Sequence, residues 1–231
     1  MTDVKDKVAL IVGAGPGLSA AVARGFAGAG MKIALAARST DDLGALARDT
    51  GALTFAADAA DAAAVKKLFA DVGARLGDPD AVVFNPSYRV RGPVADLDPA
   101  EVERSLRVTA FGGFLVGQEA ARRMLPRGAG TILFTGASAS VKGYPQSAPF
   151  AMGKFALRGL AESMARELGP KGIHVAHVVV DGGIRSANRP DGGEDRWLDP
   201  DAIAASYLHL LTQHRSAWTF EIAVRPWVET F

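Results

Sequence analysis

Three closely spaced glycines, Gly13, Gly15 and Gly17, are the first residues of the chain whose type and spacing suit chemistry. They follow the apolar run Val8–Val12 and precede a helical repeat that begins at Leu18. Glycine lets the backbone approach a phosphate closely, and a helix N-terminus carries partial positive charge. A strand, a glycine turn and a helix therefore predict a site for the pyrophosphate of a dinucleotide. Three glycines in an alanine-rich chain, taken alone, are also compatible with simple turn chemistry.

The end of the second apolar run, residues 32–37, bears on the choice of cofactor. In a dinucleotide-binding fold a carboxylate at this point binds the ribose 2′-hydroxyl of NAD(H), whereas an arginine just beyond pairs with the 2′-phosphate of NADP(H). Here Ala37 is followed by Arg38. The sequence predicts NADP(H) as the preferred cofactor, with NAD(H) possible if Arg38 is only a solvated turn residue.

Apolar runs rich in β-branched residues alternate with amphipathic helical segments along the chain. This alternation predicts an α/β fold with a parallel sheet covered by helices on both faces, and no linker interrupts it, so we expect one domain over residues 1–231. Segment 185–197 is polar, contains adjacent glycines and follows the sixth strand, where a substrate lid belongs. The predicted strands are 8–12, 32–37, 52–57, 81–84, 131–135, 173–180 and 219–224. The predicted helices include 62–76, a single long helix over 99–125, 147–168 and 200–213.

Composition excludes several classes of function. The chain has 231 residues, a net charge of +1 and no cysteine. Its balanced charge gives no electrostatic case for a nucleic acid or an anionic membrane as partner, and no apolar run reaches the ~20 residues of a membrane span. The lack of cysteine excludes disulfides, thiolate catalysis and Cys-ligated zinc. We expect a cytoplasmic protein that binds no metal.

The glycine pattern resembles the TGxxxGxG fingerprint of the short-chain dehydrogenase/reductase family. Val12 stands where that family has Thr, and Ser19 stands in place of its last Gly. The stretch ELGPKGIHV, residues 167–175, is similar to the family too, and the resemblance extends over nearly the whole chain. It implies a Rossmann-like three-layer fold with a seven-stranded sheet, a homodimer or homotetramer, and hydride transfer between a nicotinamide cofactor and a small carbonyl or alcohol substrate.

The resemblance also implies further cofactor-binding residues. Asp58 matches a residue that touches the adenine in the family, although Asp58 is equally consistent with a cap on the helix that begins near residue 61. Asn85 matches the second Asn of the family's NNAG motif and is expected to anchor the end of the fourth strand. Gly182, Ile184 and Ser186 follow the sixth strand, where the family holds the nicotinamide amide.

The proton-transfer residues of the family are only partly present. The family uses Tyr-x-x-x-Lys on one helix, and its lysine lowers the tyrosine pKa and holds the nicotinamide ribose. Lys154 matches the lysine, but Phe150 stands at the tyrosine position, and a phenyl ring neither donates nor accepts a proton. The family's serine matches Ala137, with Ser138 adjacent, and its helical asparagine matches Thr109. The resemblance thus implies a cofactor site beside a non-standard proton-transfer site.

Three side chains could replace the missing acid. Tyr144 lies upstream between Gly143 and Pro145 and either swings into the site or packs as a loop residue. Lys154, if partly desolvated, is a better acid than an exposed lysine, because burial disfavours its charged form. Ser138 either presents its hydroxyl to the substrate or hydrogen-bonds the loop backbone.

Three functions stay open at this point. The chain is an oxidoreductase with an atypical site, a catalytically impaired NADP(H)-binding sensor or regulatory protein, or a structural subunit of a mixed oligomer. The retained Lys154 and the lid segment favour the oxidoreductase, whereas the missing tyrosine favours the other two. A fold alone does not choose among them.

Overall fold

The computed structural model describes residues 3–186 and 188–229. Seven parallel strands form one sheet in the order β3-β2-β1-β4-β5-β6-β7. The predicted α/β fold with a seven-stranded parallel sheet is confirmed. The strands are β1 (Val8–Val12), β2 (Lys32–Ala37), β3 (Leu53–Ala56), β4 (Ala81–Phe84), β5 (Gly130–Thr135), β6 (Ile173–Val180) and β7 (Glu221–Val224).

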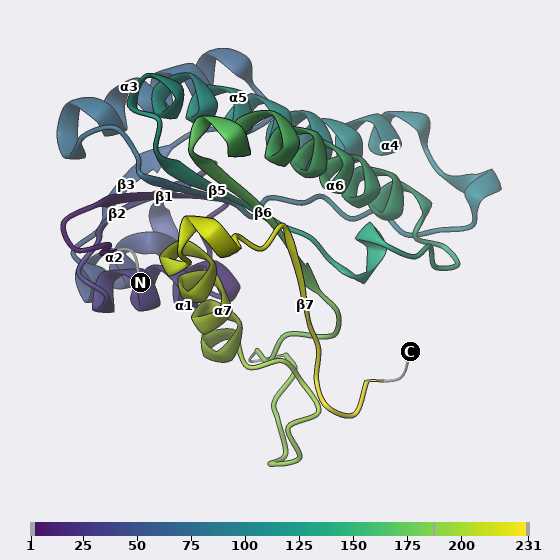
Figure 1. Ribbon diagram of the computed structural model, residues 1–231. Helices are drawn as coiled ribbons and strands as arrows, with labels where there is room; N and C mark the ends of the chain where they lie inside the picture. Colours follow the sequence, from purple (N-terminus) through teal and green to yellow (C-terminus); the bar gives the residue numbers. More distant parts are fainter. Residues whose placement is uncertain (1–2, 187, 230–231) are drawn as a thin grey trace.

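Helices cover both faces of the sheet, which gives three layers. Figure 1 shows α3, α4, α5 and α6 on one side of the strands and α1, α2 and α7 on the other. The helices are α1 (Leu18–Gly28), α2 (Gly44–Thr50), α3 (Ala62–Leu76), α4 (Pro99–Leu106), α5 (Gly112–Met124), α6 (Ala148–Leu168) and α7 (Pro200–Thr212).

The strands form because their residues suit a sheet that is covered on both faces. Every residue of β1, β4 and β6 is buried, as expected for central parallel strands rich in Val, Ile and Ala. Phe26 and Tyr207 fill the layer between the sheet and helices α1 and α7, and Phe69 and Leu157 lie in the opposite layer. The sheet is thus a rigid platform whose carboxyl edge can position functional side chains.

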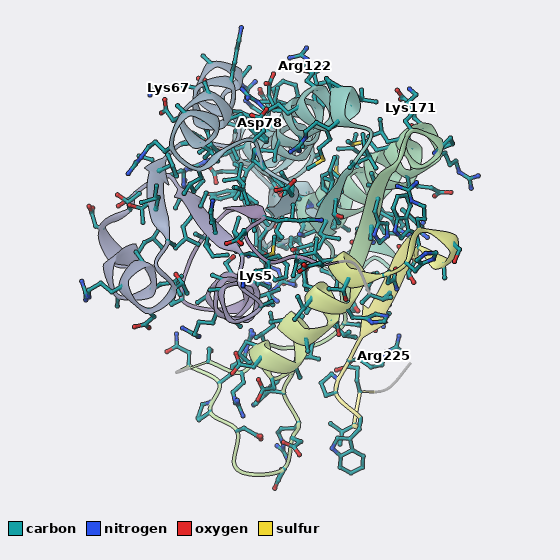
Figure 2. The ribbon with its side chains drawn as sticks, turned by 60° about the vertical axis from the view of Figure 1, so that its left-hand side comes forward. Lys5, Lys67, Asp78, Arg122, Lys171 and Arg225 are labelled. Atoms are coloured by element: carbon teal, nitrogen blue, oxygen red, sulfur yellow. The ribbon has the colours of Figure 1, made fainter. Side chains whose placement is uncertain are left out.

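Several charged side chains lie at the periphery of this platform. In Figure 2, Lys67, Asp78, Arg122 and Lys171 stand at the outside of the molecule. Within the part of the chain that the structure describes, no helix combines the length and the apolar character that crossing a membrane requires.

The predicted single helix over 99–125 is wrong in its middle. A π-helical turn, Arg107–Phe111, separates α4 from α5. Thr109 is wholly buried in this turn, and its hydroxyl accepts a hydrogen bond from the backbone N–H of Tyr88 at 3.3 Å. Such turns insert an extra residue into a helix and often occur near functional sites. Local periodicity does not reveal this turn, because the contact joins segments far apart in sequence.

The two glycines at the start of α5 permit close packing. A Cβ at Gly112 would lie 3.0 Å from the carbonyl oxygen of Ala59, and one at Gly113 would lie 2.3 Å from Cδ1 of Leu157. Glycine at both positions therefore lets α5 approach the loop after β3 and helix α6. This tight layer holds α6 against the sheet.

Candidate active site

The carboxyl ends of β1, β4, β5 and β6 border a cavity of about 740 Å³. The strand order reverses between β1 and β4, and ligands of open α/β sheets bind at this point. The wall of the cavity comes from the glycine turn after β1, the loops after the other three strands, the first turns of α6, and Arg189 of segment 185–197.

The glycine turn lines this cavity with backbone. Gly13 has φ of +82°, and a Cβ there would lie 2.8 Å from Cδ of Pro86, so only glycine fits. At Gly15 and Gly17 an added Cβ would have no described atom within 4 Å, and both residues face the cavity. The N-terminus of α1 at Leu18 is therefore open to a ligand phosphate.

Ser19 connects the turn to the neighbouring strand. Its buried hydroxyl donates a hydrogen bond to the carbonyl of Gly13 at 2.9 Å and accepts one from Nδ2 of Asn85 at 2.7 Å. Asn85 thus ties the end of β4 to the turn, which the resemblance expected as an anchoring role. The sequence identified Ser19 only as a departure from the family pattern, since the contact spans 66 residues.

A second cavity of about 700 Å³ lies beside the ends of β2 and β3 and shares Gly13, Asn85 and Ser87 with the first. Arg38 and Asp58 line it, and both side chains are exposed. Asp58 accepts a hydrogen bond from the N–H of Ala60 at 2.9 Å, whereas the cap of α3 is Asp61. The alternative in which Asp58 caps that helix is therefore wrong.

Lys154 lies buried on the inner face of α6. Its ammonium donates a hydrogen bond to the backbone carbonyl of Thr135, the last residue of β5, at 2.7 Å. Burial lowers the pKa of Lys154 to about 8. The ring of Phe150, one helical turn earlier, has its centroid 5.9 Å from Nζ. The spacing of four residues thus brings both side chains to the cavity wall.

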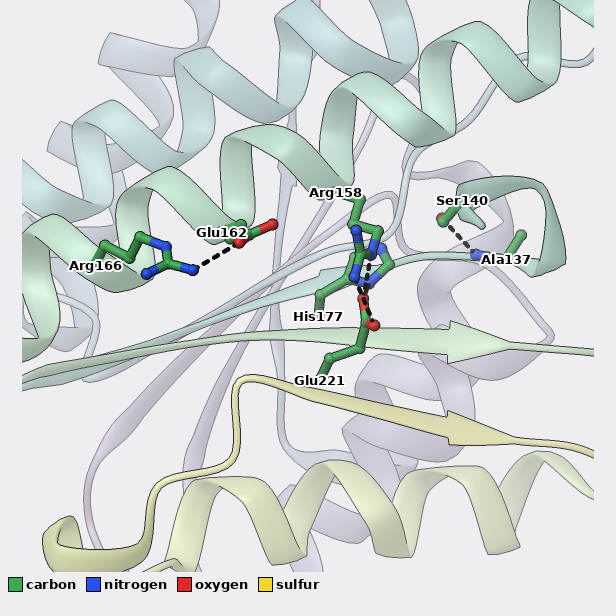
Figure 3. A network of polar contacts seen from close by, with 7 residues as sticks. All are labelled: Ala137, Ser140, Arg158, Glu162, Arg166, His177 and Glu221. Carbon is green, nitrogen blue, oxygen red and sulfur yellow. Dashed lines mark hydrogen bonds and ion pairs between the residues drawn. The ribbon is translucent and has the colours of Figure 1, made fainter. Parts of the chain in front are cut away.

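The loop after β5 presents one hydroxyl to the cavity and buries another. Ser138 lines the cavity, and its hydroxyl has no hydrogen-bond partner among the residues that the structure describes. Ser140 is fully buried and accepts a hydrogen bond from the backbone N–H of Ala137 at 3.1 Å (Figure 3). Of the two interpretations of Ser138, the geometry favours the hydroxyl that faces a substrate.

The other predicted residues differ in how close they come to the cavity. Tyr144 lies on its wall, 41% exposed, with the ammonium of Lys142 5.6 Å from its ring centroid. Gly182 and Ile184 line the cavity as well. Ser186 is exposed and lies outside the wall, so the structure does not bring its hydroxyl to the other site residues.

A polar network supports the wall from behind (Figure 3). Arg158 of α6 makes two hydrogen bonds to the carboxylate of Glu221 on β7, at 2.6 and 3.0 Å. The same carboxylate bonds Nδ1 of His177 on β6 at 2.9 Å. The other ring nitrogen of His177 is buried without a partner among the described residues and is 2.3 Å from where a Cβ of Gly136 would lie. The network therefore couples the outer strands to the loop after β5.

Three further residues of the cavity wall, which the sequence did not single out, are arginines: Arg89, Arg91 and Arg189. The first two stand two apart directly after the motif that contains Asn85. That alternation points both side chains the same way if the segment is extended, which was the available signal. Arg189 belongs to segment 185–197, and nothing local indicates that it reaches the cavity.

Comparison with known proteins identifies the family. A family model described as short chain dehydrogenase matches residues 7–196. The chain belongs to the short-chain dehydrogenase family. This agrees with the glycine turn, the strand order and the place of the cavity.

Several named relatives match over most of their length. D-threitol dehydrogenase of Mycolicibacterium smegmatis is 29% identical, over 88% of this chain and 85% of the relative. The cyclic-di-GMP-binding biofilm dispersal mediator protein of Escherichia coli is 34% identical, over 82% of this chain and 78% of the relative. A metagenomic short-chain oxidoreductase solved in complex with NADP has a TM-score of 0.86 and 27% identity, over 97% of this chain and 99% of the other.

We expect acid to destabilise the fold through the network of Figure 3. Burial lowers the pKa of His177. At Glu221 burial opposes ionisation, but the hydrogen bonds from Arg158 and His177 outweigh it and lower the pKa. Between folded and unfolded pKa values the unfolded chain binds more protons, so the free energy of unfolding falls as pH falls from about 7 to about 4. Urea unfolding at several pH values measures this slope.

Glu221→Gln separates the contribution of this carboxylate. We expect it to lower the free energy of unfolding at neutral pH by about 1–3 kcal/mol, because Arg158 loses a charged acceptor. It also flattens the slope at the acid end. Glu167→Gln is the matched control, since that exposed carboxylate of α6 lies outside the network and, among the described residues, pairs only with Lys171 four residues later, and we expect a change of less than about 0.5 kcal/mol. Equal effects of the two substitutions would contradict this account of the network.

Proposed function

We propose that this protein is an NADP(H)-dependent oxidoreductase that interconverts a small carbonyl compound and the corresponding alcohol, with a non-standard proton-transfer site. The observation that carries the proposal is the buried ammonium of Lys154, which lines the same cavity as the glycine turn. The named dehydrogenases and reductases among its relatives support the reaction class.

The residues present fit a nicotinamide dinucleotide. The bare backbone at Gly15 and Gly17 leaves room for the pyrophosphate at the N-terminus of α1. Lys154 would hold the nicotinamide ribose, and Gly182 and Ile184 would hold the nicotinamide amide. When bound, the cofactor supplies the hydride for reduction or accepts it for oxidation.

The second cavity is the adenosine side of this proposal. Arg38 would pair with the 2′-phosphate and Asp58 would contact the adenine. Arg38 forms no ion pair within residues 3–186 and 188–229, so its guanidinium is available to a phosphate. The relative solved with NADP supports a nicotinamide dinucleotide, and Arg38 supports NADP(H) over NAD(H).

The chain's own residues then provide the proton. During reduction the carbonyl oxygen must gain one, and the Lys154 ammonium, whose pKa burial lowers to about 8, is an acid close to neutrality. Ser138 donates a hydrogen bond to the same oxygen, and the neutral lysine regains its proton from solvent. Phe150, at the position of the family's tyrosine, transfers no proton. Its ring forms part of the surroundings in which Lys154 is buried.

We expect purified protein to oxidise NADPH when aldehydes and ketones are supplied, and to do so faster than it oxidises NADH. Nicotinamide fluorescence follows both reactions. Lys154→Met should lower the rate by about 10²–10⁴, as expected when a general acid is removed. Arg38→Gln should narrow the difference between the two cofactors, because it removes the partner of the 2′-phosphate.

Lys142→Met is the matched control for Lys154→Met, since Lys142 is only half-buried and contacts the ring of Tyr144 near the same cavity. Its rate should stay close to that of the unaltered protein. Thermal unfolding of both variants checks that they are folded. NADPH binding without oxidation by any carbonyl compound would instead favour the sensor, the class to which the name of the Escherichia coli relative points.

We also propose that the chain forms a homodimer or homotetramer. Four large apolar side chains are 41–49% exposed on the π-helical turn and on helices α5 and α6: Phe111, Phe114, Met152 and Phe155. An apolar group of this size is typical of a subunit interface. Sedimentation velocity should give a mass two or four times the 24.0 kDa of one chain. A monomer at micromolar concentration would contradict the proposal.

A further inference from the structure

The cavity wall carries an excess of positive charge. Arg89, Arg91 and Arg189 line it together with Lys154, and no Asp or Glu among the described residues does. The whole chain is nearly neutral, with 26 basic and 25 acidic residues. The positive charge of the cavity wall is therefore a local concentration. A cavity lined by positive charge attracts an anionic ligand.

The three guanidinium groups have no anionic partner within the described residues. None forms an ion pair or donates a side-chain hydrogen bond there. In the same segment as Arg189, Arg185 does pair with a carboxylate, that of Asp199, at 2.5 Å. Burial lowers the pKa of Arg89, and repulsion by Arg91 and Arg189 lowers it further, so the three groups are close enough to interact. An anion among them would relieve this repulsion.

Aromatic rings hold two of these arginines in place. The guanidinium carbon of Arg89 lies 4.5 Å from the ring centroid of Phe150, and that of Arg189 lies 5.9 Å from the ring of Trp197. Contact with a ring uses the flat face of a guanidinium and leaves the N–H donors at its edge available. Arginine edges fit carboxylates and phosphates through paired hydrogen bonds.

The cofactor's own phosphates do not account for this cluster. The pyrophosphate belongs at the glycine turn, and the 2′-phosphate belongs at Arg38, which lines the other cavity. Arg89 contacts Phe150, whose ring lies beside Lys154 on α6. The arginines therefore lie at the end of the cavity where the proposed chemistry takes place.

We infer that Arg89, Arg91 and Arg189 bind an oxyanion group of the substrate, so that the substrate is a small carbonyl compound bearing a carboxylate or a phosphate. The assignment of this anion to a substrate rests on the proposed oxidoreductase function. The presence of an anion-binding site does not depend on that function.

Calorimetry tests the anion site without any turnover. The probes are succinate and inorganic phosphate, with the neutral diamide of succinate as the uncharged comparison. We expect the full-length protein to bind at least one anion and not the diamide, with affinity that falls as salt is added. Replacing all three arginines by glutamine should weaken anion binding about 10- to 100-fold, because charge-assisted hydrogen bonds are lost. Arg185→Gln, in the same segment, should leave it unchanged.

Steady-state kinetics with matched charged and neutral substrates identify the substrate class. One matched pair is 4-carboxybenzaldehyde and its methyl ester, and the other is glyceraldehyde 3-phosphate and glyceraldehyde. With NADPH we expect kcat/KM to favour the charged member of one pair by about tenfold or more, and the triple variant to lose that preference while it still reduces the neutral member. A preference for 4-carboxybenzaldehyde over its ester would identify a carboxylate substrate, and a preference for glyceraldehyde 3-phosphate over glyceraldehyde would identify a phosphate substrate.

The outcomes separate this inference from the proposed function. Anion binding without oxidation of NADPH retains the site and overturns the oxidoreductase. Oxidation of NADPH with no charge preference and no anion binding overturns the inference alone. Loss of NADPH affinity in the triple variant, with anion binding unchanged, would show that the arginines serve the cofactor and would overturn the inference as well. Equal slowing of charged and neutral substrates by Arg89→Gln would assign that arginine to the reacting oxygen instead.

Discussion

The hydrogen bond from the buried Lys154 ammonium to the carbonyl of Thr135 is the constraint on which the candidate site depends. Burying an ammonium is unfavourable, and its pKa falls from 10.5 to about 8. The folded protein thus binds this proton more weakly than the unfolded chain does. Burial of the charged lysine therefore lowers the free energy of unfolding less and less as pH rises from about 8 to 10.5. A single backbone carbonyl compensates only part of this cost. The layer around α6 therefore has to hold the lysine in place, and Gly153 lies against the buried Thr109 for this reason.

The end of β5 is supported from both faces of the sheet. On one face Lys154 bonds its carbonyl, and on the other the hydroxyl of Thr135 bonds that of the buried Tyr207 at 2.7 Å. Beyond it, the loop with Ser138 rests on the buried His177 and its partners. The end of the cavity that contains Lys154 is thus built into the core, whereas Arg89, Arg91 and Arg189 lie on the loops after β4 and β6. A rigid reactive centre with charge on its loops allows substrate preference to change without disturbing the lysine.

The sequence predicted the elements whose signal is local. Four strands, 8–12, 32–37, 81–84 and 173–180, match the structure at both ends, because buried parallel strands are continuous apolar runs between clear breakers. The glycine turn after the first strand was likewise recognisable from the local sequence. The interruption of the helix over 99–125 was not, since the π-helical turn depends on tertiary contacts of Thr109. The bond between Ser19 and Asn85 and the gathering of three arginines were hidden for the same reason, because each joins segments far apart in the chain.

In the proposed reaction Lys154 supplies the proton in the absence of a tyrosine. The most direct test is the rate of NADPH oxidation in a single turnover with a saturating carbonyl substrate, measured from about pH 6 to about pH 10. We expect the rate of reduction to fall above the pKa of Lys154, about 8. Lys154→Met should abolish this fall, and Phe150→Tyr should raise the rate. A rate that is independent of pH, or a Lys154→Met variant with the same profile as the unaltered protein, would contradict this role of Lys154.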